Sequence, residues 1–132
     1  MIDETAGVVR EDPDRFGDTF YATLFELAPH TRALFPDDIT EQRLRLVNEL
    51  TFLVEAATDT DRFTTRARAL GERHAGYGVK GSDFEPVRNA LLAALREQMD
   101  DAWTLDHERS WTFLYELIAD VMREGASEHL FD

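Results

Sequence analysis

Four histidines are the side chains of this sequence best suited to binding a metal near neutral pH, and they lie far apart. They are His30, His74, His107 and His129. None belongs to a motif that places two ligands on one helix face, as zinc and di-iron sites require. The sequence contains no cysteine, which excludes iron–sulfur clusters, thiolate-ligated or covalently attached haem, and cysteine nucleophiles.

His74 is the only histidine on an apolar helical stripe. It follows Phe63, Ala67 and Leu70 at steps of four, three and four residues, which places all four side chains on one helix face. An inward histidine fits a core imidazole bonded to a backbone carbonyl. It also fits haem, which needs one axial imidazole because the porphyrin supplies four nitrogens. We expect one ring nitrogen of His74 to donate to the carbonyl of Leu70, one turn earlier.

The elements that must position these residues are all predicted to be helices, because no stretch alternates with period two. The first strong helix is expected to begin at Asp12-Pro13 and to end at Pro29, and the second to run from about Thr40 to Ala57. The third is expected to begin at Asp59 or Asp61 and to end at Gly76 and Gly78. A Ser82-Asp83-Phe84-Glu85 capping box is expected to start the fourth, and Thr104 to cap the last. The chain is therefore predicted to be all-α, with about six helices.

Length and charge limit the class of protein. One hundred and thirty-two residues correspond to one domain, 1–132, without a reductase or output domain. The formal net charge of −13 argues against nucleic acid and anionic membranes as partners, because like charges repel. No segment reaches the roughly 18 apolar residues of a membrane span, and the acidic start has no apolar signal core. We expect a cytoplasmic protein.

Several short stretches together carry a resemblance to a known family. They are Phe20-Tyr21-Ala22-Thr23-Leu24-Phe25, Ala33-Leu34-Phe35, Glu41-Gln42-Arg43, Glu72-Arg73-His74 and Ala119-Asp120-Val121. With these stretches the chain resembles the single-domain bacterial haemoglobins and the globin domain of flavohaemoglobins over about residues 8–126. The resemblance implies an all-α globin fold of about six to seven helices that sandwich one haem b, with the first helix short or absent.

The resemblance also implies roles for particular residues. His74 matches the iron ligand, Tyr21 and Gln42 match the polar pair on the opposite, distal side, and the remaining cofactor contacts are Phe35, Arg45, Leu46, Arg73, Val79, Phe84 and Val87. Arg45 and Arg73 are the expected partners of the haem propionates. Taken alone, Tyr21 also fits a core tyrosine, Gln42 a surface residue, and the two arginines solvated charges.

The chain departs from the family in two ways that bear on chemistry. The segment between Phe35 and Gln42 is about three residues shorter than usual, so the loop at the haem edge is expected to be rebuilt. Phe84 and Ala126 stand where flavohaemoglobins carry a tyrosine and a glutamate that raise the basicity of the iron-bound histidine. Their replacement by apolar side chains argues against a strongly activated, peroxidase-like site.

The resemblance implies an activity and leaves alternatives open. The expected function is reversible binding of O2, and also NO and CO, at a five-coordinate iron. A second function is NO dioxygenation with a separate reductase as partner. A third is gas sensing, and a fourth is an all-α interaction module without haem. The sequence leaves the protein as a monomer or a homodimer.

Overall fold

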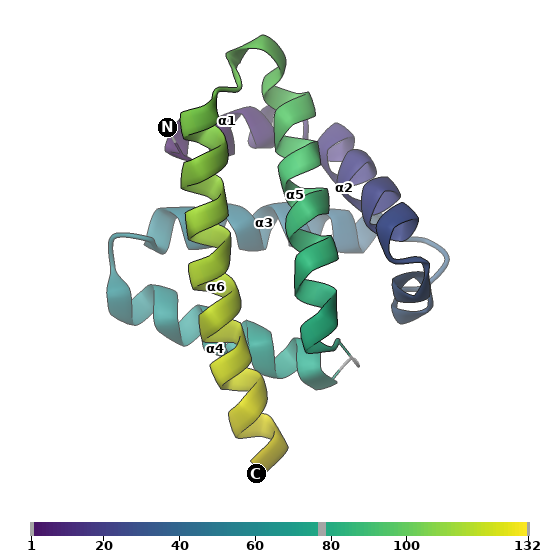
Figure 1. Cartoon of the computed structure of the whole chain (residues 1–132), viewed down its shortest axis with the longest axis vertical. Helices are drawn as coiled ribbons and strands as arrows, with labels where there is room; N and C mark the ends of the chain where they lie inside the picture. The colour runs from purple at the N-terminus through teal and green to yellow at the C-terminus, as the bar shows by residue number, and fades with distance from the viewer. Residues whose placement is uncertain (1, 77–78, 132) are drawn as a thin grey trace.

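We describe the chain from a computed structural model, which covers residues 2–76 and 79–131, with side chains through residue 126. These residues form six α-helices and three short 3-10 helices, without a strand (Figure 1). In chain order they are α1 (Ile2–Glu11), α2 (Pro13–Leu27), η1 (Pro29–Leu34), α3 (Thr40–Ala56), α4 (Thr60–Gly76), η2 (Gly81–Asp83), α5 (Phe84–Met99), η3 (Asp100–Ala102) and α6 (Leu105–Phe131). The all-α prediction is confirmed, and the first helix is short.

Polar side chains fix three helix starts where the sequence indicated them. The Asp12 carboxylate accepts from the Arg15 amide at 3.2 Å, and Asp59 accepts from the Arg62 amide at 3.3 Å. The Thr104 hydroxyl accepts from the amide of His107 at 3.3 Å. Each bond satisfies one of the amides that a helix start leaves without an intrahelical partner. The predicted stop at Gly78 lies outside the described residues.

The expected capping box over residues 82–85 is wrong. The helix begins at Phe84 after the η2 turn, so Ser82 precedes the cap position by one residue. Asp83 turns its carboxylate backwards instead, where Oδ2 accepts from the Lys80 amide at 2.9 Å. Its other oxygen, Oδ1, lies 2.7 Å from Nε2 of His30. Asp83 therefore joins the corner after α2 to the corner after α4.

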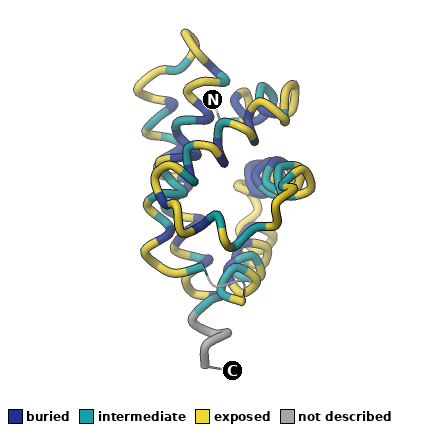
Figure 2. Tube along the Cα trace, turned by 90° about the vertical axis from the view of Figure 1, so that its right-hand side faces the viewer, coloured by how far each residue is buried: buried dark blue, intermediate teal, exposed yellow. Residues whose placement is uncertain are grey.

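The helices are arranged in two crossing pairs. The helices α5 and α6 run side by side at the front of the view, and α3 and α4 cross behind them (Figure 1). The most extensive pairings are α4 with α6 and α2 with α5. Buried and exposed residues alternate along each helix, so that each helix turns one face inward (Figure 2). No helix within the described residues is long and apolar enough to cross a membrane.

Two glycines allow α4 and α6 to cross at backbone contact. A Cβ atom built on Gly71 of α4 would lie 2.0 Å from the carbonyl oxygen of Met122, and one on Gly125 of α6 would lie 2.1 Å from that of Arg68. Any larger residue would force the helices apart, because these neighbours are backbone atoms that cannot rotate away. The crossing fixes the position of α4 three residues before His74.

Candidate functional site

The α3–α4 hairpin places Gln42 and His74 on opposite arms. Gln42 lies in the first turn of α3, and His74 lies in the last turn of α4. The turn over residues 57–59 joins the other ends of the two helices, so both residues lie towards the open end of the hairpin (Figure 1). Because the two helices are equally long and run in opposite directions, Gln42 and His74 lie at the same end of the hairpin although they are far apart in sequence.

His74 makes the hydrogen bond expected of it. Its Nδ1 lies 2.8 Å from the carbonyl oxygen of Leu70. A carbonyl only accepts, so Nδ1 carries the hydrogen and Nε2 carries the lone pair that a metal can use. Burial, more than any other factor, lowers the pKa of the His74 imidazole and so favours the neutral, metal-binding form.

This donor set fits haem. Within the part of the chain that the structure describes, no group of three or more histidine, aspartate or glutamate side chains could hold a bare metal ion. A metal at His74 would therefore need a cofactor that brings its other ligands, and an iron porphyrin brings four. A single neutral imidazole, fixed by its second nitrogen, is the protein ligand that such a cofactor requires.

On the other side of the hairpin, Tyr21 of α2 is hydrogen-bonded to Gln42 of α3. Tyr21 is buried, and its hydroxyl donates to the backbone carbonyl of Gln42 at 3.4 Å. Burial raises the pKa of Tyr21 to about 12, so the phenol keeps its proton and remains a donor. The side-chain Oε1 of Gln42 is buried and has no hydrogen-bond partner among the described residues. A buried acceptor without a donor is costly, so Oε1 would be satisfied by a bound group that donates to it, and the amide nitrogen of the same side chain is the atom that can donate to an acceptor.

Aromatic rings surround Tyr21. The ring of Phe35 lies 5.3 Å from that of Tyr21 in an edge-on arrangement, and the ring of Phe25 lies 5.8 Å from each of them. Arg32 closes the shortened loop beyond Phe35: its guanidinium lies 5.2 Å from the Phe25 ring centre and donates to three carbonyls over residues 35–37. The sequence interpretation missed Arg32, because bonds to loop carbonyls leave no signature in residue type or spacing.

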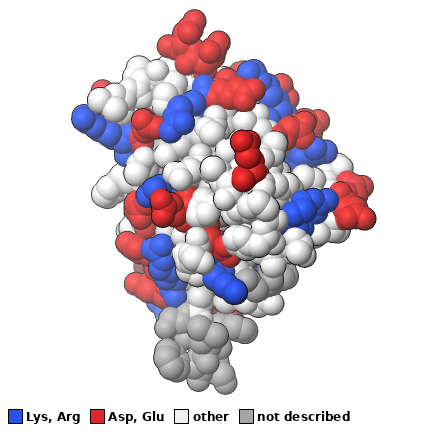
Figure 3. Space-filling view, turned by 45° about the vertical axis from the view of Figure 1, so that its right-hand side comes forward, with Lys and Arg blue, Asp and Glu red and all other residues white. Residues whose placement is uncertain are grey.

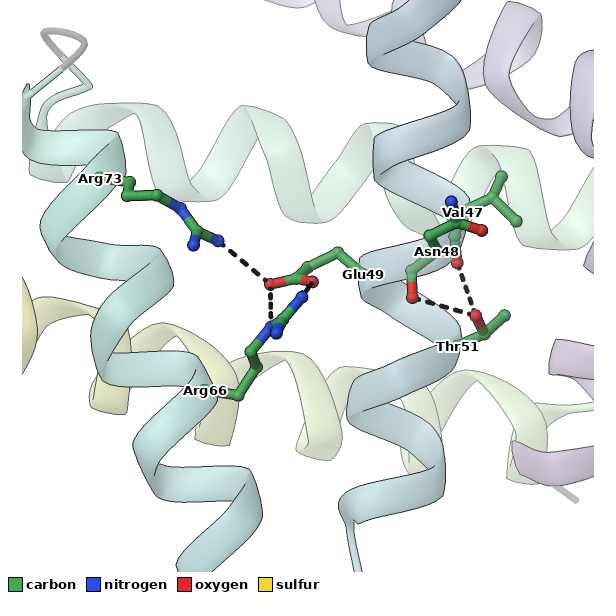
Figure 4. Close-up of polar contacts among 6 residues, drawn as sticks. All are labelled: Val47, Asn48, Glu49, Thr51, Arg66 and Arg73. Atoms are coloured by element: carbon green, nitrogen blue, oxygen red, sulfur yellow. Dashed lines mark hydrogen bonds and ion pairs between the residues drawn. The ribbon is translucent and has the colours of Figure 1, made fainter.

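A carboxylate on α3 holds α4 through two arginines. Glu49 accepts from Arg66 through two nitrogens, at 2.9 Å and 2.8 Å, and from Arg73 at 3.4 Å (Figure 4). We call these three residues the Glu49 clasp. Glu49 follows Gln42 by two helical turns, so it belongs to the same face of α3. That spacing was the available signal for Glu49, which the sequence interpretation did not use.

The two arginines expected at the haem edge have carboxylate partners. Arg73 lies against Glu49 in the clasp. Arg45 forms an ion pair with Glu41 on its own helix at 2.5 Å, and both side chains are largely exposed. The exposed Arg45 pair is worth little, so Arg45 can turn to another anion at small cost. Arg73 instead shares a carboxylate that is only 16% exposed, so its contact is the harder of the two to give up.

The remaining expected contacts lie on the His74 side or in the core. The amide of Val79 donates to the His74 carbonyl at 3.1 Å. Phe84 lies under the guanidinium of Arg123, 4.5 Å from the ring centre. Leu46, Phe84 and Val87 are partly buried against the core. The side chain of His129 lies outside the described residues.

The contacts described above form two groups. Tyr21, Gln42 and Phe35 make one group, and His74 and Val79 make the other, while Arg73 of α4 pairs with Glu49 of α3. This division, with polar donors facing one side and an imidazole on the other, is the arrangement that a flat cofactor between the arms would use.

The sequence of this chain matches a known protein family. A family model described as "Globin" matches residues 18–122. The chain is 23% identical over 122 residues to an anaerobic nitrite reductase of Oryza sativa subsp. indica, covering 88% of this chain and 84% of that protein. It is 22% identical over 138 residues to one of Physcomitrium patens, covering 93% and 77%. Among solved structures, the closed form of the HGbRL globin domain is 36% identical over 98% of this chain and 94% of that chain, with a TM-score of 0.49. Because the family model matches most of the length of this chain, the chain belongs to the globin family.

Proposed function

We propose that this globin binds haem b through His74 and reversibly binds O2, and also NO and CO, at a five-coordinate iron. The observation that carries the proposal is the state of His74, a neutral imidazole whose Nδ1–H is held by the Leu70 carbonyl. Haem, when bound, supplies an open coordination position for a diatomic gas. The chain's own residues then orient the ligand, donate hydrogen bonds to it and exclude water.

The Tyr21 and Gln42 pair suits gas retention better than acid catalysis. A pKa of about 12 makes the Tyr21 hydroxyl a poor acid at neutral pH, and an amide does not titrate. Both side chains can nevertheless donate a hydrogen bond. O2 gains negative charge on binding and accepts such bonds, whereas CO stays nearly neutral. The pair therefore favours O2 over CO.

The other expected contacts are proposed to pack against the porphyrin and to exclude water. Phe35 and Leu46 on the distal side, and Val79, Phe84 and Val87 on the His74 side, are apolar and partly buried. They suit the faces of a porphyrin, and they exclude water from the ligand position, which strengthens any hydrogen bond made there. Arg45 and Arg73 are proposed to exchange their carboxylate partners, Glu41 and Glu49, for the haem propionates.

The test is the visible spectrum of the purified chain with haem, in its ferric, ferrous and CO-bound forms. A Soret band that shifts with CO and with oxidation state is expected. His74→Ala should lose haem, or keep it only with added imidazole. His30→Gln is the matched control, because His30 is largely exposed and lies outside the proposed ligand set. No Soret band, or an unchanged spectrum in His74→Ala, would overturn the proposal.

Nitrite reduction is a second candidate, because the relatives named above are nitrite reductases. Reduction of nitrite to NO consumes one electron and two protons, and releases water. The proposed distal pair holds no group that titrates near neutrality, which disfavours proton delivery. NO formation from nitrite by the ferrous protein, compared with free haem, measures this activity directly.

NO dioxygenation is the third candidate, and it needs an electron donor to restore the ferrous state after each turnover. Its partner would be a separate reductase. NO consumption that continues only when a reductase is added would favour this enzyme over an O2 carrier. Gas sensing is the fourth candidate, and it would use an output element that responds to the ligand.

A further inference from the structure

The outer face of α6 exposes two large apolar side chains one turn apart. Phe113 is 74% exposed and Leu117 is 43% exposed. The opposite face of α6 packs on α4 through the glycine crossing, and α6 lies along the front of the molecule in Figure 1. Two large apolar side chains side by side on one exposed helix face form a small patch that a partner could cover.

Charged residues extend this face in both directions. Counted from Phe113, Asp106 and Arg109 lie seven and four residues before it, and Leu117 and Asp120 lie four and seven residues after it. These intervals place all five residues on one helical stripe, and all five are exposed. Arg123 follows at its edge. The order along the stripe is minus, plus, two apolar residues, minus, plus.

This order is self-complementary for an antiparallel pair. Residues 109 and 120, and residues 106 and 123, are each centred between positions 114 and 115. A second copy rotated about that point would place its Asp120 opposite Arg109 and its Arg123 opposite Asp106. The four apolar side chains of the two copies would meet in the middle. A parallel pair would instead put like charges side by side.

Arg109 and Asp120 are available for such contacts, whereas Arg123 also lies over the Phe84 ring of its own chain. Arg109 has no hydrogen bond or ion pair among the described residues. Asp120 is 71% exposed and forms an ion pair with Arg123 on the same helix. Exposed pairs of this kind contribute little. Both groups can therefore turn to a second copy at small cost.

We propose that this α6 face, made of Asp106, Arg109, Phe113, Leu117, Asp120 and Arg123, is a homodimer interface in which two copies of α6 pack antiparallel about a twofold axis. The contact is isologous, so each charge pair occurs twice. Specific interfaces bury about 1,200–2,000 Å² in total, and a contact made by one pair of helices belongs at the low end of that range. Acidic and basic groups are interspersed over the face that Figure 3 shows. The net charge of −13 nevertheless makes two copies repel each other, and salt near 0.15 M screens that repulsion.

The test is the mass of the full chain by analytical ultracentrifugation at 0.15 M salt, from about 5 µM to about 1 mM, the range suited to a small interface. We expect a shift from monomer to dimer within that range. Phe113→Asp should remain monomeric throughout. Its fold should be unchanged by circular dichroism, because the side chain is exposed. Leu44→Asp, which changes another half-exposed leucine on α3, should dimerise normally.

Charge reversal tests the antiparallel register. Arg109→Asp and Asp120→Arg should each weaken dimerisation at least tenfold, because each creates two like-charge contacts. The double variant Arg109→Asp with Asp120→Arg should recover to within about threefold of the original. Arg62→Asp on α4 makes the same net charge change away from the face and should have little effect. A monomer at 1 mM, a dimer indifferent to Phe113→Asp, or a double variant that fails to recover would each overturn the proposal.

Discussion

The Tyr21 hydroxyl is the donor most suited to holding O2. It is buried and protonated, and its present acceptor is a long bond of 3.4 Å to the Gln42 backbone. A hydrogen bond to a partly charged acceptor in a dry site is worth about 1.5–3 kcal/mol. Tyr21→Phe should therefore speed O2 release by about 10- to 100-fold, measured by stopped flow, while CO release changes much less.

Gln42→Leu provides the companion measurement. It should speed O2 release less than Tyr21→Phe does, if Tyr21 is the principal donor. The two changes should be non-additive, because both side chains serve one ligand. An O2 off-rate within about twofold of the original in Tyr21→Phe would mean that the hydroxyl stays with the Gln42 carbonyl and does not reach the gas.

The surroundings of His74 predict an imidazole of low basicity, which would donate little electron density to the iron. Nδ1 donates to a neutral carbonyl, whereas a carboxylate there would make the imidazole more basic. Phe84 and Ala126 offer no polar group. We expect the Fe–His stretch in the resonance Raman spectrum to lie below that of flavohaemoglobins, and peroxidase activity to be low. Phe84→Tyr combined with Ala126→Glu should raise the frequency, and an original value already as high as theirs would contradict the idea.

Residues whose contacts are local in sequence were the predictable ones. The His74 bond to Leu70 follows from helix geometry, since a side chain in the last turn lies over the carbonyl one turn earlier. Arg73 was expected at a propionate, and the structure shows it against Glu49. That pairing depends on how α3 and α4 cross, which residue spacing within either helix does not reveal. The globin family was recognisable from the sequence, and the bacterial or flavohaemoglobin type stays a prediction.

Between helices, the crossing of α4 and α6 depends on glycine. Gly71→Ala would bring a Cβ to 2.0 Å from the Met122 carbonyl oxygen, so the helices must separate. We expect the free energy of unfolding to fall by about 3 kcal/mol, the upper end for overpacking, measured by urea denaturation. Gly7→Ala is the control, because a Cβ there meets nothing within 4 Å. In the interior of α1 that change should instead stabilise by about 0.5–1 kcal/mol.

The Glu49 clasp joins α3 to α4 by charge. Glu49 is only 16% exposed and holds Arg66 through two nitrogens, a geometry stronger than that of a single exposed pair. Glu49→Gln should lower the free energy of unfolding by about 1 kcal/mol. Glu41→Gln breaks the exposed Arg45 pair and should cost less than half as much. Equal losses in the two variants would show that the clasp adds nothing beyond a surface pair.

Helix starts were predictable, and helix crossings were not. Asp12, Asp59 and Thr104 act within one turn, so residue type and position suffice to indicate them. The capping box at residues 82–85 failed because Asp83 bonds to Lys80 and His30, across a turn that the sequence did not reveal. Gly71 and Gly125 lie within helices, where glycine is unfavourable. That cost was the available signal for a close backbone approach.

At the scale of the whole molecule, acidic charge opposes folding. Twenty-seven acidic and fourteen basic residues leave a net charge of −13, and most of the ion pairs are exposed and contribute little. Raising NaCl from 0.01 M to 0.15 M shortens the screening length from about 30 Å to about 8 Å, which relieves long-range repulsion more than short contacts. We expect Tm to rise by about 5 °C, from roughly 1–2 kcal/mol of relieved repulsion, measured at low protein concentration so that dimerisation does not contribute.

Asp101→Lys, which changes the charge from −13 to −11 at an exposed site, should respond less to salt. A Tm that falls with salt would mean that the ion pairs, and not the net charge, dominate the electrostatic stability.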